Sequence, residues 1–251
     1  MKTMKFLIIF LLISISNLEI INDVVVIKNR AWEGYETGTG AYYIAYSPYI
    51  TGYTKATSYI RLPSSLNTNR GKRNAYISLG ALGLYGAIDT GIMNSGDGWK
   101  PYYNDISRKQ FKSFKEYTAP EGTSIVGIEV EVTSSRTVIF SLSFRNNNLY
   151  ILKSFSIPID ASHILVYENS KVKNRFYRFA SFVPTENDNQ NDGTYMIGGA
   201  FNDLTIVKNG QGQSWGINTD NIDVSWLVSS QKINFYYQRD EEYFSIIHEM
   251  R

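Results

Sequence analysis

Apolar and polar residues alternate with a period of two along several stretches of the chain, which is typical of half-buried β-strands. Residues 125–133 and 138–145 show the pattern most clearly, because one face is Ile, Val, Leu or Phe and the other is mainly Glu, Ser or Thr. The triplet Asn146-Asn147-Asn148 predicts a turn, so residues 138–145 and 149–157 are expected to form a hairpin.

Short β-rich runs separated by turn residues predict many more strands. They cover residues 24–28, 41–45, 57–62, 75–79, 164–168, 175–183, 195–197, 203–207, 232–238 and 243–248. No stretch beyond the N-terminal segment keeps a helical period over three turns. We therefore predict an all-β chain with one domain over residues 24–251, a β-sandwich of the jelly-roll or concanavalin-like kind.

The N-terminal segment indicates export. Lys2 and Lys5 precede an unbroken apolar run over residues 6–13, and Ser14 and Ser16 follow it. This order predicts a signal peptide over residues 1–16, cleaved after Ser16. The apolar run is about half of the roughly 20 residues that a membrane-spanning helix needs, so we expect no transmembrane span in the mature chain and a secreted, extracellular protein.

Composition narrows the choice of partner. The chain has no Cys, so an exported domain must be stabilised by its core. Its 25 basic and 23 acidic residues are interspersed and leave a net charge of +2, which argues against a nucleic-acid partner. Aromatic residues are abundant, with 19 Tyr, 13 Phe and 4 Trp, and they suit both sheet packing and contact with sugars.

The candidate site centres on Asp89. If residues 87–92 form a strand, Ala87, Asp89 and Gly91 share one face. The two small neighbours project almost nothing, so the carboxyl of Asp89 is expected to face an open trough. The alternative is a tight hairpin whose glycines serve only the turn.

Aromatic residues near Asp89 are the expected walls of this trough. Trp99, Tyr102 and Tyr103 follow a Gly- and Asp-rich loop, and Trp215 lies in a second glycine-framed loop. Rings that stack on sugar faces, beside a carboxyl that accepts hydroxyl protons, would form a saccharide site. The alternative for both tryptophans is packing in the core.

Catalytic patterns are absent from the sequence. Concanavalin-like glucanases carry a strand resembling Glu-x-Asp-x-Glu, and retaining hydrolysis needs two carboxyls about 5–5.5 Å apart. Here Ala87 and Gly91 occupy the positions of the two Glu. Neither His163 nor His248 has a partner at metal-ligand spacing. Residues 188–193 resemble the start of a calcium loop, but Gly199 occupies the position of the bidentate Glu ligand. We therefore predict no cofactor, and the sequence gives no support for calcium binding.

Several short motifs together resemble the YrpD family, small secreted bacterial proteins of unknown function. They are Arg30-Ala31-Trp32, Leu62 to Ser65, Ala75 to Ile77, Asp89-x-Gly91, Trp99 to Tyr102 and, more weakly, Phe201 to Ile206. The resemblance spans residues 24–210 with loops of different length. It implies secretion and a β-rich fold, and it supplies no catalytic or ligand-binding residue.

The sequence is compatible with three classes of function. The favoured one is a lectin-like module that binds extracellular or cell-wall polysaccharide through Asp89, Trp99, Tyr102, Tyr103 and Trp215. The second is a polysaccharide hydrolase or lyase with a non-standard active site. The third is a structural protein of the envelope or extracellular matrix that self-associates through strand edges and a Tyr-rich surface.

Overall fold

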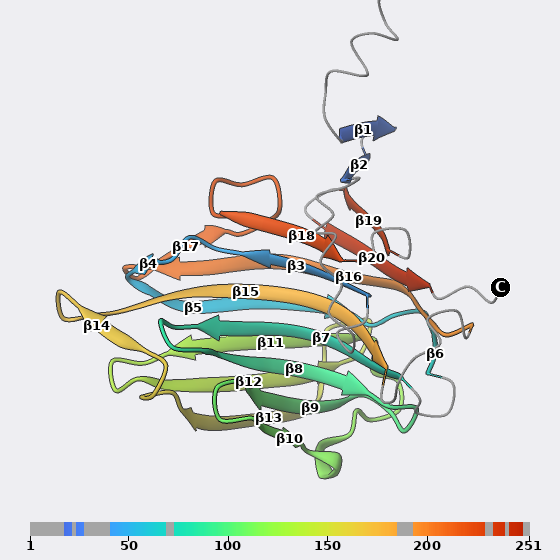
Figure 1. Cartoon of the computed structure of the whole chain (residues 1–251). Helices are drawn as coiled ribbons and strands as arrows, with labels where there is room; N and C mark the ends of the chain where they lie inside the picture. Colours follow the sequence, from blue (N-terminus) through green and yellow to red (C-terminus); the bar gives the residue numbers. More distant parts are fainter. Residues whose placement is uncertain are drawn as a thin grey trace, which may run out of the picture.

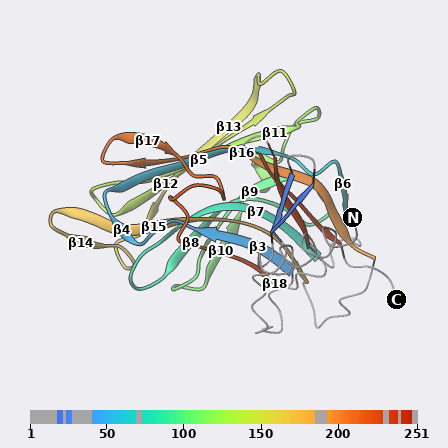
Figure 2. The same cartoon turned by 90° about the horizontal axis from the view of Figure 1, so that it is seen from above.

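The computed structural model describes residues 18–21, 24–27, 41–68, 73–184, 193–228, 233–238 and 241–247. Within these residues the chain folds into two antiparallel β-sheets packed face to face, which confirms the predicted all-β sandwich (Figure 1). Viewed from above, the layer with β5, β11, β13 and β16 lies apart from the layer with β3, β7, β8 and β10 (Figure 2). The predicted signal peptide and the calcium-like loop at residues 188–193 lie wholly or largely outside the described residues, as does His248.

Sheet 1 follows the order β1-β2-β19-β20-β16-β5-β11-β12-β13, with β6 and β17 paired to β16. Its strands are β1 (Leu18–Ile21), β2 (Val24–Ile27), β5 (Tyr53–Arg61), β6 (Ser65–Asn67), β11 (Ile125–Val132), β12 (Thr137–Arg145), β13 (Ile151–Asp160), β16 (Tyr195–Lys208), β17 (Gln211–Ser214), β19 (Ile233–Gln238) and β20 (Glu241–Ile247).

Sheet 2 follows the order β10-β9-β8-β7-β15-β3-β18, with β4 and β14 paired to β15. Its strands are β3 (Ala41–Tyr46), β4 (Ile50–Thr51), β7 (Arg73–Leu82), β8 (Ala87–Asn94), β9 (Lys100–Asp105), β10 (Gln110–Ser113), β14 (Val166–Glu168), β15 (Lys171–Pro184) and β18 (Val224–Val228). A single 3₁₀ turn, η1 (Lys115–Tyr117), is the helical element of the described chain.

The alternating stretches fold as predicted. Burial in β11 and β12 switches at every residue, so Val130 and Phe140 face the core while Glu129 and Ser141 face outward. The two strands pair along their full length, and the predicted hairpin from β12 to β13 forms through the Asn146 turn. Period-two patterning therefore decides which face of sheet 1 is buried.

Other segments differ from the prediction. Residues 195–197 and 203–207 were expected as two strands, but both belong to β16, which shifts register between Asn202 and Thr205. Residues 100–103 were not among the expected strands, and residues 212–214 were expected in a loop, but they form most of β9 and most of β17. Cross-strand partners supply the backbone hydrogen bonds in these segments, and the local sequence does not reveal those partners.

A buried ion pair connects the two sheets. Arg178 on β15 of sheet 2 and Glu242 on β20 of sheet 1 are both fully buried, and Arg178 Nε donates to Glu242 Oε2 at 2.8 Å. Glu242 also accepts hydrogen bonds from the Tyr43 hydroxyl at 2.9 Å and from the Ile217 backbone N–H at 2.7 Å. The carboxylate is thus surrounded by donors, as a buried charge requires.

Trp215 completes this cluster. Its ring lies 4.8 Å from the guanidinium carbon of Arg178, a cation–π contact, and its side chain is fully buried. The exposed loop position expected for Trp215 is therefore corrected to a core position, because the ring covers the charge of Arg178 between the sheets.

Breaking the pair from one side should destabilise the fold strongly. Glu242→Leu would leave the Arg178 charge buried without its partner, so the free energy of unfolding should fall by about 3–5 kcal/mol in chemical denaturation. The double change Arg178→Met with Glu242→Leu should recover part of this loss. Recovery would be incomplete because Tyr43 and Ile217 still lack their acceptor.

The adjacent pair Arg61–Glu241 is the matched control. It joins side chains at 3.0 Å with 45% and 25% exposure, so Glu241→Leu should change stability by less than about 1 kcal/mol. Equal effects of Glu241→Leu and Glu242→Leu would contradict the interpretation that burial of the charge controls the loss.

Candidate functional site

The candidate site is a cavity of about 470 Å³ on the outer face of sheet 2, the face turned away from the core. Its lining is mainly aromatic and aliphatic, with one carboxyl and one amide near the centre. The residues are Tyr42, Ile44, Tyr46, Tyr76, Leu82, Ala87, Asp89, Tyr102, Asn104, Ile106, Phe111, Tyr177, Phe179, Ser181 and Val183.

Tyr177 and Asp89 meet across a glycine. In the sheet, Tyr177 on β15 pairs with Gly80 on β7, and Gly80 pairs with Asp89 on β8. A Cβ at Gly80 would lie 2.3 Å from Cζ of Tyr177, so the missing side chain lets the ring lie flat across β7. The Tyr177 hydroxyl then donates a hydrogen bond to Oδ1 of Asp89.

A second tyrosine side chain, from β9, also reaches across a glycine to a hydrogen-bond partner. Tyr102 on β9 pairs with Gly91 on β8, which pairs with Ser78 on β7. The Tyr102 hydroxyl and the Ser78 hydroxyl share a hydrogen bond across Gly91. Two buried rings thus form the floor of the cavity, and their hydroxyls are satisfied within it.

The rim of the cavity is aromatic. Phe111 on β10 stacks on Tyr102 with ring centroids 5.7 Å apart, and Tyr76 meets Tyr102 edge-on at 5.0 Å. On the other side, Tyr46 tilts against Tyr177 at 5.4 Å, and Phe179 stacks on Tyr177 at 6.2 Å. Phe111 is half exposed, so a ligand in the cavity could reach its face.

Asp89 carries the polar chemistry of the cavity. Burial raises the pKa of Asp89 to about 6, against the lowering effect of the hydrogen bonds from Tyr177 and Asn104. Asn104 donates to Oδ2 at 3.1 Å. Near neutral pH the carboxyl can therefore exchange a proton, and it can accept from or donate to a ligand hydroxyl.

The structure brings together only part of the predicted site. Asp89 and Tyr102 both line the cavity, on neighbouring strands. Tyr103 follows Tyr102 on β9, so it points to the opposite face and packs against the core at 6.2 Å from Phe114. Trp99 is buried in the same core.

Trp99 is 8% exposed and Trp215 is fully buried, so they offer a ligand almost no surface, and neither lines the cavity. Both tryptophans pack in the core, as the alternative interpretation predicted. The Gly-rich loop between β8 and β9 is a turn, in which Asn94 Oδ1 accepts from the Gly96 N–H at 2.7 Å.

Tyr177, Asn104, Phe111 and Tyr46 are the site residues that sequence reasoning missed. Asn104 lies two residues after Tyr102, so the period of two could have placed it on the same face. No local signal identifies Tyr177, which is 88 residues from Asp89 in the sequence.

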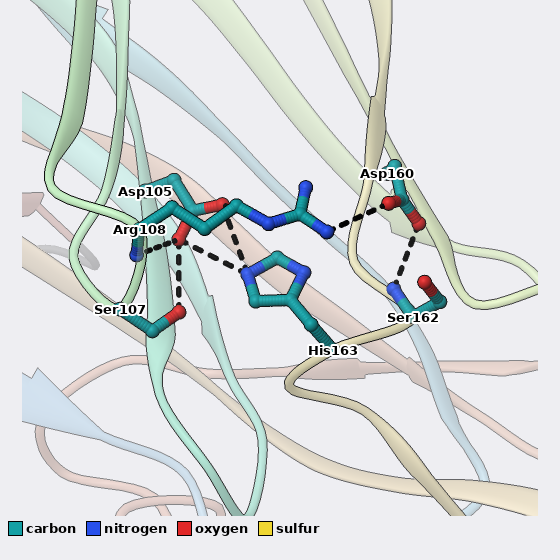
Figure 3. Close-up of polar contacts among 6 residues, drawn as sticks. All are labelled: Asp105, Ser107, Arg108, Asp160, Ser162 and His163. Carbon is teal, nitrogen blue, oxygen red and sulfur yellow. Dashed lines mark hydrogen bonds and ion pairs between the residues drawn. The ribbon is translucent and has the colours of Figure 1, made fainter.

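A second polar cluster joins the edges of the two sheets (Figure 3). Asp105, at the end of β9, accepts hydrogen bonds from the Ser107 hydroxyl at 2.9 Å and the Arg108 backbone N–H at 3.1 Å. His163 Nε2 lies 2.9 Å from Oδ2 of Asp105. Arg108 Nη2 donates to Asp160, at the end of β13, at 3.0 Å.

This cluster has the residue types of a hydrolase triad but not its order. Ser107 donates to Asp105 and not to His163, so the carboxylate lies between the hydroxyl and the imidazole. His163 Nδ1 is buried, so no substrate can reach it. Burial would raise the pKa of Asp105, but the hydrogen bonds from Arg108, His163 and Ser107 outweigh it and hold that pKa below its usual value. We interpret the cluster as a structural link.

The described residues contain no group of three or more His, Cys, Asp or Glu side chains placed to hold a metal ion. No helix in the same part of the chain is long and apolar enough to cross a membrane.

The sequence matches no protein-family model and no curated protein. Solved structures with a similar architecture include scytalido-glutamic peptidase with a peptide-based transition-state analogue, at 14% identity and a TM-score of 0.49, covering 84% of this chain and 98% of that one. SCP-B, an eqolisin-family peptidase in complex with the tripeptide Ala-Ile-His, shows 12% identity, a TM-score of 0.47 and the same coverage. A protein of unknown function from Shewanella oneidensis MR-1 shows 9% identity and a TM-score of 0.31, over 93% of this chain and 79% of that one. These likenesses concern the two-sheet architecture.

The raised pKa of Asp89 predicts a pH-dependent stability. The pKa of Asp89 is about 6 in the folded chain, against an ordinary 3.8. The protonated carboxyl therefore stabilises the folded chain fully below pH 3.8, and this stabilisation is lost as the pH rises through 6. Asp89→Asn removes this titration. The melting temperature of Asp89→Asn minus that of the parent should therefore increase from pH 4 to pH 7. Thermal unfolding of both proteins at each pH would measure this difference.

Asp97 provides a control of opposite sign. Hydrogen bonding to Lys100 holds the pKa of Asp97 below its ordinary 3.8, so its contribution is present above that pH and is lost in acid. Asp97→Asn should lower the melting temperature near neutral pH, and less so in acid. A melting-temperature difference for Asp89→Asn that stays flat from pH 4 to pH 7 would contradict the proposed titration.

Proposed function

We propose that this chain is a secreted glycan-binding protein that holds a saccharide in the cavity of sheet 2. The observation that supports this most directly is the aromatic cavity with the carboxyl of Asp89 at its floor, oriented by Tyr177 and Asn104. Apolar ring faces match the C–H faces of a sugar, and a few fixed polar groups match its hydroxyls.

The polar groups suit hydroxyl recognition. Asp89 and Asn104 contact each other at 3.1 Å, so together they present a carboxyl oxygen and an amide to the same region of the cavity. Phe111, Tyr46 and Phe179 surround them with ring surface. Because Tyr177 and Tyr102 are already hydrogen-bonded to Asp89 and Ser78, they act as the platform.

Binding is favoured over hydrolysis because the cavity has a single acid. Among the described lining residues Asp89 is the one carboxyl, whereas glycoside hydrolysis by paired acids needs two. Gly91 and Ala87 flank Asp89 on its strand, so no second carboxyl is supplied there. The site can therefore hold a sugar without the pair of acids that cleaves it.

The extracellular location is part of the same proposal. It is supported by the basic, apolar and small-residue order of residues 1–16 and by the resemblance to the secreted YrpD family. Cell-wall or extracellular polysaccharide is the partner class that such a location would supply.

Removing a rim ring should weaken glycan binding and leave the fold intact. Phe111 is half exposed on the edge strand β10, so Phe111→Ala should reduce affinity by about 3- to 10-fold, the effect of one aromatic contact. Asp89→Asn should also weaken binding. Affinity electrophoresis against a panel of soluble polysaccharides, followed by titration calorimetry on the best ligand, would measure both.

Tyr150→Ala is the matched control, because Tyr150 is an exposed ring on the β12–β13 hairpin of sheet 1, outside the cavity. It should bind as the parent does. The proposal fails if the parent retains no polysaccharide of the panel, or if Tyr150→Ala and Phe111→Ala weaken binding equally.

A further inference from the structure

The hairpin formed by β12 and β13 presents four consecutive apolar side chains to solvent, two in its turn and two at the start of β13. Leu149, Tyr150, Ile151 and Leu152 are 48%, 70%, 57% and 41% exposed. We call residues 149–152 the hairpin tip. In Figure 2 the hairpin beside the β13 label extends beyond the body of its layer. A contiguous exposed apolar run of this kind marks an interaction site more often than an ordinary surface.

Hydrogen bonds fix the shape of this hairpin tip. Asn146 Oδ1 accepts from the backbone N–H groups of Asn148 at 3.0 Å and Tyr150 at 3.1 Å. Leu149 has a φ of 64°, the left-handed region that a leucine rarely adopts, and its carbonyl accepts from Arg145 Nη1 at 3.0 Å. The turn is therefore built to hold the apolar side chains outward.

Two cations flank the hairpin tip without neutralising partners. Arg145 ends β12 and Lys153 follows Leu152, and neither forms a salt bridge with any residue that the structure describes. Lys153 Nζ donates to the backbone carbonyl of Glu116 at 2.7 Å and lies over the Tyr117 ring, and no ion pair links it to the Glu116 carboxyl. Arg145 Nε also donates to Ser143 Oγ at 3.0 Å, and its guanidinium lies over the Tyr59 ring. Both cations are thus held by neutral groups, and no carboxylate of the described residues neutralises their charge.

We propose that the hairpin tip docks on an anionic lipid surface, with its apolar side chains entering the headgroup and acyl boundary. Aliphatic residues, a tyrosine and a pair of cations are the combination that binds such an interface. A stable contact with a second copy would bury on the order of 800 Å² on each partner, and four side chains on a protruding turn offer much less.

The absence of Cys permits a local test in the full chain. Tyr150→Cys would carry an environment-sensitive fluorophore at the hairpin tip. With vesicles of phosphatidylcholine and phosphatidylglycerol, its emission should shift to the blue and rise by about twofold or more, as the probe leaves water. Vesicles of phosphatidylcholine alone should give a much smaller change.

Tyr85→Cys is the matched labelling site. Tyr85 is 66% exposed on the β7–β8 turn. Its backbone N–H faces the carbonyl of Ile164, which lies beyond the other end of β13 from the hairpin tip. A fluorophore at position 85 should therefore keep its emission unchanged when vesicles are added. Ile151→Ser with Leu152→Ser should abolish the Tyr150→Cys response, and Lys153→Gln should weaken it.

Four results would overturn the proposal. They are no response at position 150, equal responses at positions 150 and 85, and equal responses to neutral and anionic vesicles. The fourth is a shift that grows with protein concentration without vesicles, which would assign the hairpin tip to contact between copies of the chain.

Discussion

The contact between Arg178 and Glu242 is the constraint on which the arrangement of the two sheets depends. A charge pair with no exposure to water is favourable only if every strong donor around the carboxylate is in place. Tyr43 of β3, Arg178 of β15, the Ile217 backbone and Glu242 of β20 must therefore meet in one geometry. An apolar core alone would tolerate small shifts of one sheet over the other, whereas such shifts would break the directional hydrogen bonds of this network.

Fixing sheet 2 from the inside also fixes its outer face. Arg178 and Tyr177 are neighbours on β15 and point to opposite sides of the sheet, so the residue that anchors the core follows the cavity residue by one position. From that position the Tyr177 ring crosses Gly80 and reaches Asp89. The positions of the side chains at the cavity floor therefore depend on the packing between the two sheets.

The sequence was informative wherever local patterning decides the outcome. The alternation in residues 125–145 correctly placed the buried faces of β11 and β12. The period of two also placed Asp89 on the same face of its strand as Ala87, and both line the cavity. Trp99, Tyr103 and Trp215 could not be placed, because a bulky ring gives no sign of which face it occupies until the strand register is known. Tyr177 is 88 residues from Asp89, and Arg178 is 64 from Glu242, so both contacts depend on the order of strands in space.

The glycine-crossing tyrosines divide the cavity into two parts with different freedom to change. Tyr102 and Tyr177 are buried, and replacing either would disturb the strands that they cover. Phe111, Tyr46 and Phe179 form the rim around them and leave the sheet hydrogen bonds untouched when their side chains vary. Divergence among relatives of this protein would then be confined to the rim, and a new preference for ligand could arise there while the floor stays the same.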